Sequence, residues 1–304
     1  MTRPATHIWR LFKWGITLAR HRALVGIEHD PNAPGPVRRM AKLARWVAFT
    51  GTRGERDYAG AFRDIGPAAI KLGQTLATRP DLVGEEPARN LLKLQDDLPP
   101  VPFEKIRASI EASFEQPLEA LWSEFDPVPI GAASIAQVHR ATTTDGRQVA
   151  VKVLRPGVRE RFARDIDTYE WAAAHLESFG VEAARLRPRL VIANFKRWTN
   201  RELDLRREAA SASELAEHMV GTEGYEIPGI DWGRTNGRVM TVDWIDGIKI
   251  SNTEALKAAG HDTEEIASRL VLAFLKQAIA AGFFHACLLY TSPSPRDGLL
   301  SRMP

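Results

Sequence analysis

The residues with the clearest chemical potential lie between 128 and 153, where small side chains precede a single lysine in an apolar strand. Residues 131–134, Gly-Ala-Ala-Ser, form a predicted loop with almost no side-chain bulk. Such a loop lets backbone N–H groups approach phosphate oxygens closely. Lys152 interrupts the apolar run 149–153, and a lysine there can place its ammonium over the phosphates of a nucleotide. The alternative is a β-hairpin whose lysine points into solvent.

Acidic residues that could hold this lysine lie farther along the chain. The predicted helix 190–219 carries Asp204 and Glu208, which are four residues apart and would share one face. Two carboxylates on one face repel each other unless cations lie opposite them. The pair could belong to a surface helix neutralised by neighbouring arginines. Alternatively, one carboxylate holds the ammonium of Lys152 in place, as a helix glutamate does in kinases.

A second polar pair, Lys71 and Gln74, lies three residues apart on another predicted helix, so the two share a face. Ile70 and Leu76 are the expected core positions of that helix. From residue types alone, Lys71 and Gln74 are expected to form a solvated polar face.

Short apolar runs predict the strands that must position Lys152. They are residues 128–130, 135–141, 149–153, 227–230 and 238–245. Asp145-Gly146 predicts a hairpin turn, because glycine tolerates the positive φ that short hairpin loops need. Residues 1–125 are predicted to be mostly helical, with further helices at 158–179, 190–219 and 264–284. The last of these is expected to be a buried core helix, since Lys276 and Gln277 interrupt its apolar run.

The composition is that of an ordinary globular protein and excludes several classes. The 304 residues can bury one large core or two ordinary ones. A net charge of +3 is too small to indicate nucleic-acid binding. The single cysteine excludes an internal disulfide framework, and no Cys/His cluster has zinc spacing. No run reaches the roughly 18 apolar residues of a membrane-spanning helix.

Residues 7–24 mix tryptophans and aliphatic side chains with arginines and lysines. An amphipathic segment of this composition favours a helix that lies at a membrane surface. A helix that packs on its own protein fits the same pattern, so both interpretations stay open. The segment lacks the apolar core and cleavage site of a signal peptide.

Taken in order, these stretches resemble the UbiB family, the aarF-domain, protein-kinase-like proteins linked to ubiquinone biosynthesis. The resemblance runs from about residue 60 to 286. It rests on a Lys-x-Gly-Gln motif at 71–74, an Ala-rich loop at 130–139, the lysine strand 149–152, a Glu-x-Asp motif at 202–204, and Glu208. Five such motifs in the family's order are highly specific.

The resemblance implies an α+β, protein-kinase-like fold. Its expected parts are an N-terminal helical segment (1–55), a helical extension (56–125), an antiparallel-sheet small lobe with inserted helices (126–248), the start of an incomplete helical large lobe (249–286), and an unrelated tail (287–304). The implied cofactors are ATP and Mg²⁺. The residues implied to bind ATP are Ile130, Gly131, Ala132, Ala133, Ser134, Ile135, Ala136, Gln137, Val138, Lys152 and Glu208.

The family's Lys-x-Gly-Gln helix is implied to pack across the nucleotide site as a regulatory motif. Lys71, with Gly73 and Gln74 beside it, would face Glu202 and Asp204, which reverses the expectation of a solvated Lys71. This arrangement would block a protein substrate and favours ATPase activity or a small or lipid substrate. The implied place is the cytoplasmic face of a membrane, held peripherally. The implied partners are membrane lipid or a polyprenyl-phenol and the enzymes of ubiquinone biosynthesis, with no nucleic acid.

The sequence departs from the family after Ala286. The family continues with an aspartate, a His-Pro-Gly-Asn stretch and an Asp-Phe-Gly-like triplet, which carry the catalytic aspartate and the Mg²⁺ ligands. Here a Ser/Pro-rich run follows, and Arg296-Asp297 has no asparagine at the required spacing. We therefore expect the printed sequence to lack catalytic residues and metal ligands and to be inactive as an enzyme.

Two other functions fit the same residues. A non-catalytic nucleotide-binding scaffold or lipid-handling protein at the membrane surface would be stabilised by nucleotide without releasing phosphate. A membrane-surface helical protein would depend on residues 7–24, and its binding to liposomes would not require Lys152.

Overall fold

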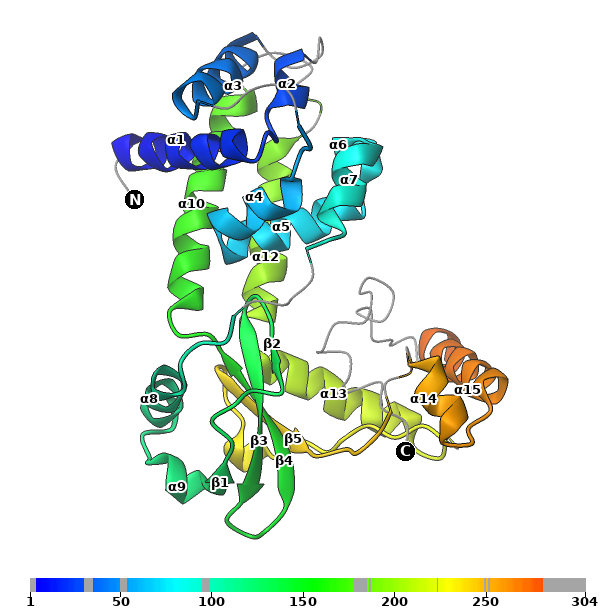
Figure 1. The fold of residues 1–304 in the computed structure, drawn as a ribbon. Helices are drawn as coiled ribbons and strands as arrows, with labels where there is room; N and C mark the ends of the chain where they lie inside the picture. The colour runs from blue at the N-terminus through cyan, green and yellow to red at the C-terminus, as the bar shows by residue number, and fades with distance from the viewer. Residues whose placement is uncertain are drawn as a thin grey trace. The chain divides into compact units, whose positions relative to one another are not determined.

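The computed structural model describes residues 4–29, 35–49, 54–94, 99–177, 185, 187–222, 224–248, 250 and 252–280 (Figure 1). The chain forms two compact units. Unit 1 comprises Met1–Gln95 and Gly157–Asn200, and unit 2 comprises Asp96–Pro156 and Arg201–Pro304. Two helices predicted inside the small lobe therefore group with the N-terminal helices, and the lobe boundaries stay predictions. Within the described residues, no helix is both long and apolar enough to cross a membrane.

Unit 1 is helical throughout its described residues. Its helices are α1 (Pro4–Arg20), α2 (Val25–His29), α3 (Gly35–Val47), α4 (Tyr58–Ile65), α5 (Pro67–Ala77), α6 (Pro80–Val83), α7 (Glu85–Leu91), α10 (Val158–Leu176) and most of α12 (Pro188–Glu202). Local sequence explains the α4–α5 junction: Asp57 caps α4 by accepting from the Gly60 N–H, and Pro67 opens α5 after Gly66. α1 lies against α10, where the His7 ring stacks on Trp171.

Unit 2 is built on one antiparallel sheet. Its strands are β1 (Trp122–Phe125), β2 (Gly131–Ala132), β3 (Ala136–Thr143), β4 (Gln148–Leu154) and β5 (Val239–Asp243), in the order β1-β3-β4-β5 with β2 also paired to β3. The predicted Asp145-Gly146 hairpin is confirmed, since Gly146 has φ of 88° between β3 and β4. The expectation that strands begin only near residue 128 is wrong, because β1 precedes that point. β1 has only four residues, too few for a clear alternating pattern in the sequence.

The two faces of this sheet have different coverings (Figure 1). On one face, α8 (Phe103–Phe114) and α9 (Leu118–Leu121) pack on alternate residues of β4. This core contains Ile106, Ile110, Trp122, Val149, Val151, Val153 and Val239. Side chains alternate along a strand, so Lys152 projects from the opposite face. α13 (Leu205–Met219) lies on that side.

The predicted single helix 190–219 is wrong, because α12 and α13 are separate helices. The Asp204 side chain accepts from the Arg206 N–H and caps α13, so Asp204 does not share a helix face with Glu208. The short aspartate side chain competes with backbone hydrogen bonds in helix interiors and favours this capping position. Leu203, which precedes the cap, is buried.

Three smaller predictions also need correction. The predicted strand 227–230 is reduced to an isolated bridge between Ile230 and Val242. The predicted strand 128–130 is displaced to β2, at 131–132. The predicted helix 264–284 is α15 (Thr263–Leu275) followed by a π-helical turn (η3, Lys276–Ala280); its remaining residues and the tail 287–304 lie outside the described residues. The expectation that it is a buried core helix is wrong for the described residues, because Ala273 is the one buried residue of α15, whereas Leu272 and Ile279 are exposed. The other short elements are η2 (Trp232–Arg234) and α14 (Thr253–Ala258).

His139, on β3, is fully buried on the face covered by α8. Its Nδ1 lies 2.8 Å from the Asp126 carbonyl oxygen, and its Nε2 lies 2.8 Å from Gln137 Nε2. These partners suit a neutral ring that donates from Nδ1 and accepts at Nε2. Burial therefore lowers the pKa of His139 from its ordinary value of 6.5.

We predict that acid destabilises unit 2 through His139. Above pH 6.5 the ring is neutral in both the folded and unfolded states. As the pH falls below that value, the unfolded chain binds a proton that the folded chain excludes, so the free energy of unfolding decreases. Thermal unfolding between about pH 7.5 and about pH 5.5 should show this loss. The loss should be smaller in His139→Gln, which hydrogen-bonds but does not titrate. An NMR titration of His139 with a midpoint above 6.5 would contradict the prediction.

Candidate functional site

An ion pair between Lys152 and Glu208 is the centre of the candidate site. The Lys152 Nζ donates to Glu208 Oε1, and the two side chains are 6% and 35% exposed. The lysine comes from β4, which lies between β3 and β5. The glutamate comes from the first turn of α13. The contact predicted between these residues is therefore present, whereas their role in binding ATP stays a prediction.

α13 is held in unit 2 by its own apolar stripe, whose C-terminal members Leu215 and Met219 pack with Ala273 of α15. The buried side chains recur at helical spacing and are Leu205, Ala209, Ala212, Leu215 and Met219. At the start of the helix, the Leu205 N–H donates to the Gly237 carbonyl, 3.2 Å away, just before β5. These contacts place Glu208 beside β4. A carboxylate in the first turn is also favoured by the helix dipole.

The small-residue segment 131–134, predicted to be a tight loop, begins with two strand residues and leads into a hairpin reversal. Gly131 and Ala132 form β2, opposite Val138 and Gln137 of β3. The chain reverses at 133–136, where the Ala133 N–H donates to the Ala136 carbonyl at 2.8 Å. Short side chains permit this close pairing.

The sheet register brings this hairpin and the lysine onto neighbouring strands. Val138 lies directly opposite Lys152, and Ala136 lies opposite Leu154. The hairpin tip is therefore adjacent to the end of the strand that carries the ammonium. Backbone and ammonium at one end of a sheet can together bind an anion such as phosphate.

Gln137 lies on the other face of the sheet from Lys152. Its Oε1 accepts from the Val101 N–H at 2.9 Å, and its Nε2 contacts His139. The side chain, 1% exposed, joins β3 to the segment before α8. The family resemblance implies that Gln137 is among the ATP-binding residues, but its side chain is directed to Val101 and His139.

Arg155 is a residue at this site that the sequence prediction missed. Its Nε donates to the Ala133 carbonyl at 2.8 Å, and its Nη2 donates to the Pro99 carbonyl at 2.9 Å. Its backbone N–H donates to the Ile135 carbonyl at 2.8 Å. Arg155-Pro156-Gly157 indicated only a strand end, and nothing in that tripeptide signals a contact with the hairpin.

The Lys-x-Gly-Gln motif lies on α5 in unit 1. Gln74 Nε2 donates to the Leu94 carbonyl at 3.2 Å, and Gly73 is buried within the helical unit. Glu202 is the last residue of α12, and Asp204 is the cap of α13. The implied approach of Lys71 to these two acids links unit 1 with unit 2 and stays a prediction.

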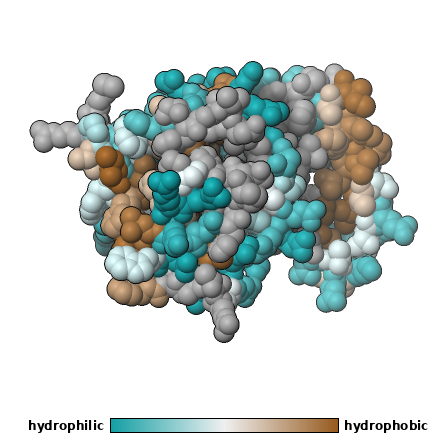
Figure 2. Space-filling model, turned by 90° about the horizontal axis from the view of Figure 1, so that it is seen from above, coloured by the Kyte–Doolittle hydropathy of each residue, from teal (hydrophilic) through white to brown (hydrophobic). Residues whose placement is uncertain are grey.

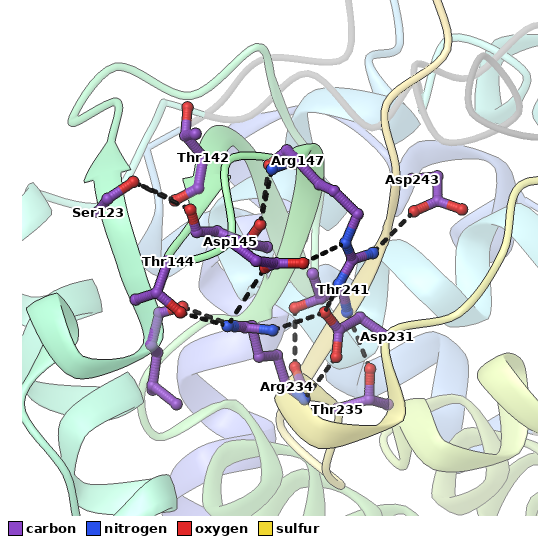
Figure 3. A network of polar contacts seen from close by, with 12 residues as sticks. Ser123, Thr142, Thr144, Asp145, Arg147, Asp231, Arg234, Thr235, Thr241 and Asp243 are labelled. Atoms are coloured by element: carbon purple, nitrogen blue, oxygen red, sulfur yellow. Dashed lines mark hydrogen bonds and ion pairs between the residues drawn. The ribbon is translucent and has the colours of Figure 1, made fainter.

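A separate network of charged side chains connects the β3–β4 turn with residues next to and within β5 (Figure 3). Arg147 contacts Asp145 at 2.8 Å, Asp231 at 2.9 Å and Asp243 at 3.3 Å. Arg234 donates to Asp231 and to the Leu121 carbonyl. Hydrogen bonding to Arg147 holds the pKa of the Asp145 carboxyl well below its usual range. The network ties the β3–β4 turn to β5 and is structural.

The described residues contain no group of three or more His, Cys, Asp or Glu side chains that could hold a metal ion. Arg296-Asp297, considered in the sequence as a catalytic motif, lies outside them.

Comparison with known proteins identifies relatives of the chain. Residues 93–288 match the ABC1 atypical kinase-like domain. The chain is 37% identical over 284 residues to "Probable protein kinase UbiB" of Marinobacter nauticus, covering 92% of this chain and 52% of that protein. It thus spans about half the length of this curated relative. A solved structure, the complex of Rv3197 with erythromycin from Mycobacterium tuberculosis, is 28% identical with a TM-score of 0.41, covering 61% of this chain and 46% of that one.

We predict that Gly73→Ala destabilises unit 1. A Cβ at this position would overlap Leu94 Cδ1 and lie 2.7 Å from Phe62 Cδ1. Overpacking of this kind costs about 1–3 kcal/mol, more than the helix propensity gained, which is at most about 1 kcal/mol. The matched control is Gly15→Ala on α1, whose Cβ would lie 3.7 Å from Ala44 Cβ. Chemical denaturation should show a loss for the first variant and none for the second; equal effects would contradict the packing explanation.

Proposed function

Because the chain belongs to the ABC1 atypical kinase-like family, we propose that unit 2 binds ATP. The observation that supports this best is the ion pair between Lys152 and Glu208, two residues that lie 56 positions apart in the sequence. A lysine on a central strand, held by a helix glutamate, is the arrangement by which kinases direct an ammonium at the α- and β-phosphates. The strand that carries the lysine and the helix that carries the glutamate come from different parts of the sequence.

The residues present fit a nucleotide's phosphates. The ammonium of Lys152 supplies positive charge, and the carboxylate of Glu208, which is the more exposed partner of the pair, orients it. The hairpin at 131–134 supplies backbone with little side-chain bulk, where Ile130, Ile135, Ala136 and Val138 are apolar neighbours. ATP bound there would supply the γ-phosphoryl group, and this chain's residues would bind and orient it.

The described residues fit the phosphates of ATP, but they do not supply a binding site for Mg²⁺. The described residues offer no cluster of carboxylates for it, and no step of the proposal depends on the ion. The family resemblance assigns its ligands to positions after Ala286, outside the described residues.

The wider role that we propose is support of ubiquinone biosynthesis by a UbiB-type protein. The substrate class would be a small molecule or lipid, such as a polyprenyl-phenol, and the partners would include the enzymes of that route. The rival role is a non-catalytic nucleotide-binding scaffold or lipid-handling protein. Phosphate release in the presence of ATP separates the two roles, whereas ATP binding is common to both.

A second proposal concerns α1 and α3, which would hold the protein at the cytoplasmic face of a membrane. Neither helix contains an acidic residue, and together they carry Arg10, Lys13, Arg20, Arg38, Arg39, Lys42 and Arg45. Their exposed apolar side chains are Ile8, Trp9, Phe12, Met40, Leu43 and Trp46. We call these six residues the apolar surface of unit 1. Figure 2 shows hydrophobic and hydrophilic surface side by side on the face seen from above.

The two sequence interpretations of the first helix concern different sides of it. One side packs on α10, where Trp14 lies 5.2 Å from the Tyr169 ring and His7 accepts or donates a hydrogen bond with Thr168 at 3.2 Å. The other side exposes Trp9, over whose ring the Lys13 Nζ lies at 4.0 Å. Exposed aromatic side chains among cations match an anionic lipid surface.

We predict that Lys152→Met weakens ATP binding by about 10- to 100-fold, because it removes a charge-assisted contact worth about 1.5–3 kcal/mol. Glu208→Gln should weaken binding less, by about 5-fold, since the ammonium remains but loses its charged partner. Isothermal titration calorimetry and nucleotide-dependent thermal shifts measure both effects. The control, Lys105→Met, removes an exposed lysine of α8 and should bind ATP normally. Absence of ATP binding by the parent chain, or equal loss in all three variants, would refute the proposal.

We predict that the protein binds vesicles containing about 30% anionic phospholipid and binds neutral vesicles much less. Trp46→Ser should reduce this binding by about 10-fold, because a large apolar side chain contributes about 1.5–3 kcal/mol when buried. Trp198→Ser, which removes an exposed tryptophan from α12 rather than α1 or α3, is the matched control; Trp198 is 55% exposed and Trp46 is 73% exposed. Sedimentation with vesicles measures the effect. The proposal fails if Trp46→Ser and Trp198→Ser bind equally, or if lipid charge has no influence.

A further inference from the structure

The contacts of Arg155 join three segments of unit 2 that are separate in sequence. Its guanidinium donates to the Ala133 carbonyl of the hairpin tip at 2.8 Å and to the Pro99 carbonyl at 2.9 Å. Its backbone N–H donates to the Ile135 carbonyl at 2.8 Å. Arg155 therefore hydrogen-bonds two backbone carbonyls, those of Ala133 and Ile135, within the chain reversal at 133–136.

The first of these contacts determines the direction of a peptide plane. A trans peptide is planar, and its C=O and N–H groups point in opposite directions. The described peptide bonds are all trans. With its oxygen on the guanidinium, the Ala133–Ser134 peptide cannot rotate without losing a charge-assisted hydrogen bond. The same rotation would swing a carbonyl oxygen, which carries partial negative charge, to the other side of the hairpin.

The position of Arg155 links this peptide to the lysine. Arg155 follows β4 directly and lies three residues after Lys152, so its place is fixed by the strand that carries the lysine. The hairpin strand β3 is paired to that strand from Ala136 to Thr142. A rigid two-strand unit therefore carries the ammonium, the hairpin and the residue that orients the hairpin's carbonyls.

We infer that Arg155 is a positioning residue for phosphate binding: it keeps the Ala133 carbonyl oxygen turned toward its guanidinium and away from bound phosphates. The inference rests on the proposed function, since it concerns the same ATP site. Arg155 acts through the hairpin backbone and needs no contact with the nucleotide. A carbonyl oxygen released from the guanidinium would face the phosphates in part of the population and repel them.

The test compares two ligands, because the inference concerns phosphates alone. Arg155→Met should weaken ATP binding by about 5- to 30-fold, the range expected for losing one to two hydrogen bonds to a charged group. Binding of adenosine, which has no phosphates, should change less than about 2-fold. A general loss of structure would weaken both ligands together. Calorimetry with ATP and with adenosine gives the ratio directly.

Two further variants complete the experiment. Arg107→Met removes an arginine of α8 that pairs with Glu111 and Glu119, and it should bind both ligands as the parent does. Arg155→Lys keeps the charge but not the planar fork, and its ATP affinity should lie between the parent and Arg155→Met. Amide hydrogen exchange at 131–136 should be faster in both Arg155 variants than in Arg107→Met.

The outcomes separate this inference from the proposed function. If the parent chain binds ATP and Lys152→Met weakens it, but Arg155→Met binds ATP as the parent does, the inference is wrong and the proposed function stands. Equal weakening of ATP and adenosine by Arg155→Met also overturns the inference. If the parent does not bind ATP, the proposed function and the inference both fail.

Discussion

The alternation of side chains along β4 is the constraint on which the candidate site depends. Val149, Val151 and Val153 enter the core under α8, so the residue between the last two must project from the opposite face. That residue is Lys152, whose ammonium is nearly buried. A buried ammonium is costly without a partner, and Glu208 supplies the partner. The side-chain alternation of β4 therefore determines both the apolar core on one face of the sheet and the ion pair on the other.

The glutamate reaches this position because the helix that carries it begins where it does. Asp204 caps α13, which places Glu208 in the first turn, and the hydrogen bond from the Leu205 N–H to the Gly237 carbonyl fixes the start of the helix beside β5. A continuous helix through 204 would have placed Asp204 and Glu208 on one face and left two carboxylates competing for one cation. Because the helix breaks before α13, the two acids have different roles: Asp204 caps the helix, and Glu208 pairs with Lys152.

The hairpin at 131–136 depends on the same strand. β3 is paired to β4 along its length, and Arg155, at the end of β4, holds two hairpin carbonyls. Unit 1 is organised on other principles, with small residues such as Ala19, Ala41 and Ala44 allowing α1 and α3 to pack closely. That close packing leaves the apolar surface of unit 1 directed outward on both helices. The two units thus carry two different proposed functions, one for nucleotide and one for lipid.

Local sequence was sufficient wherever a short-range rule governs the chain. It predicted the antiparallel strands 135–141, 149–153 and 238–245, the Asp145-Gly146 turn, the helical N-terminal part and the kinase-like family. It also predicted the contact of Lys152 with Glu208, because the family motifs occur in order. It did not predict β1, the break at Asp204, the opposite face of Gln137, or the role of Arg155 in holding the hairpin. Each of these depends on which distant backbone group a side chain meets: Gln137 meets Val101, and Arg155 meets Ala133 and Pro99. Periodicity and residue type describe neighbours along the chain, whereas these contacts exist only after the sheet has brought distant segments together.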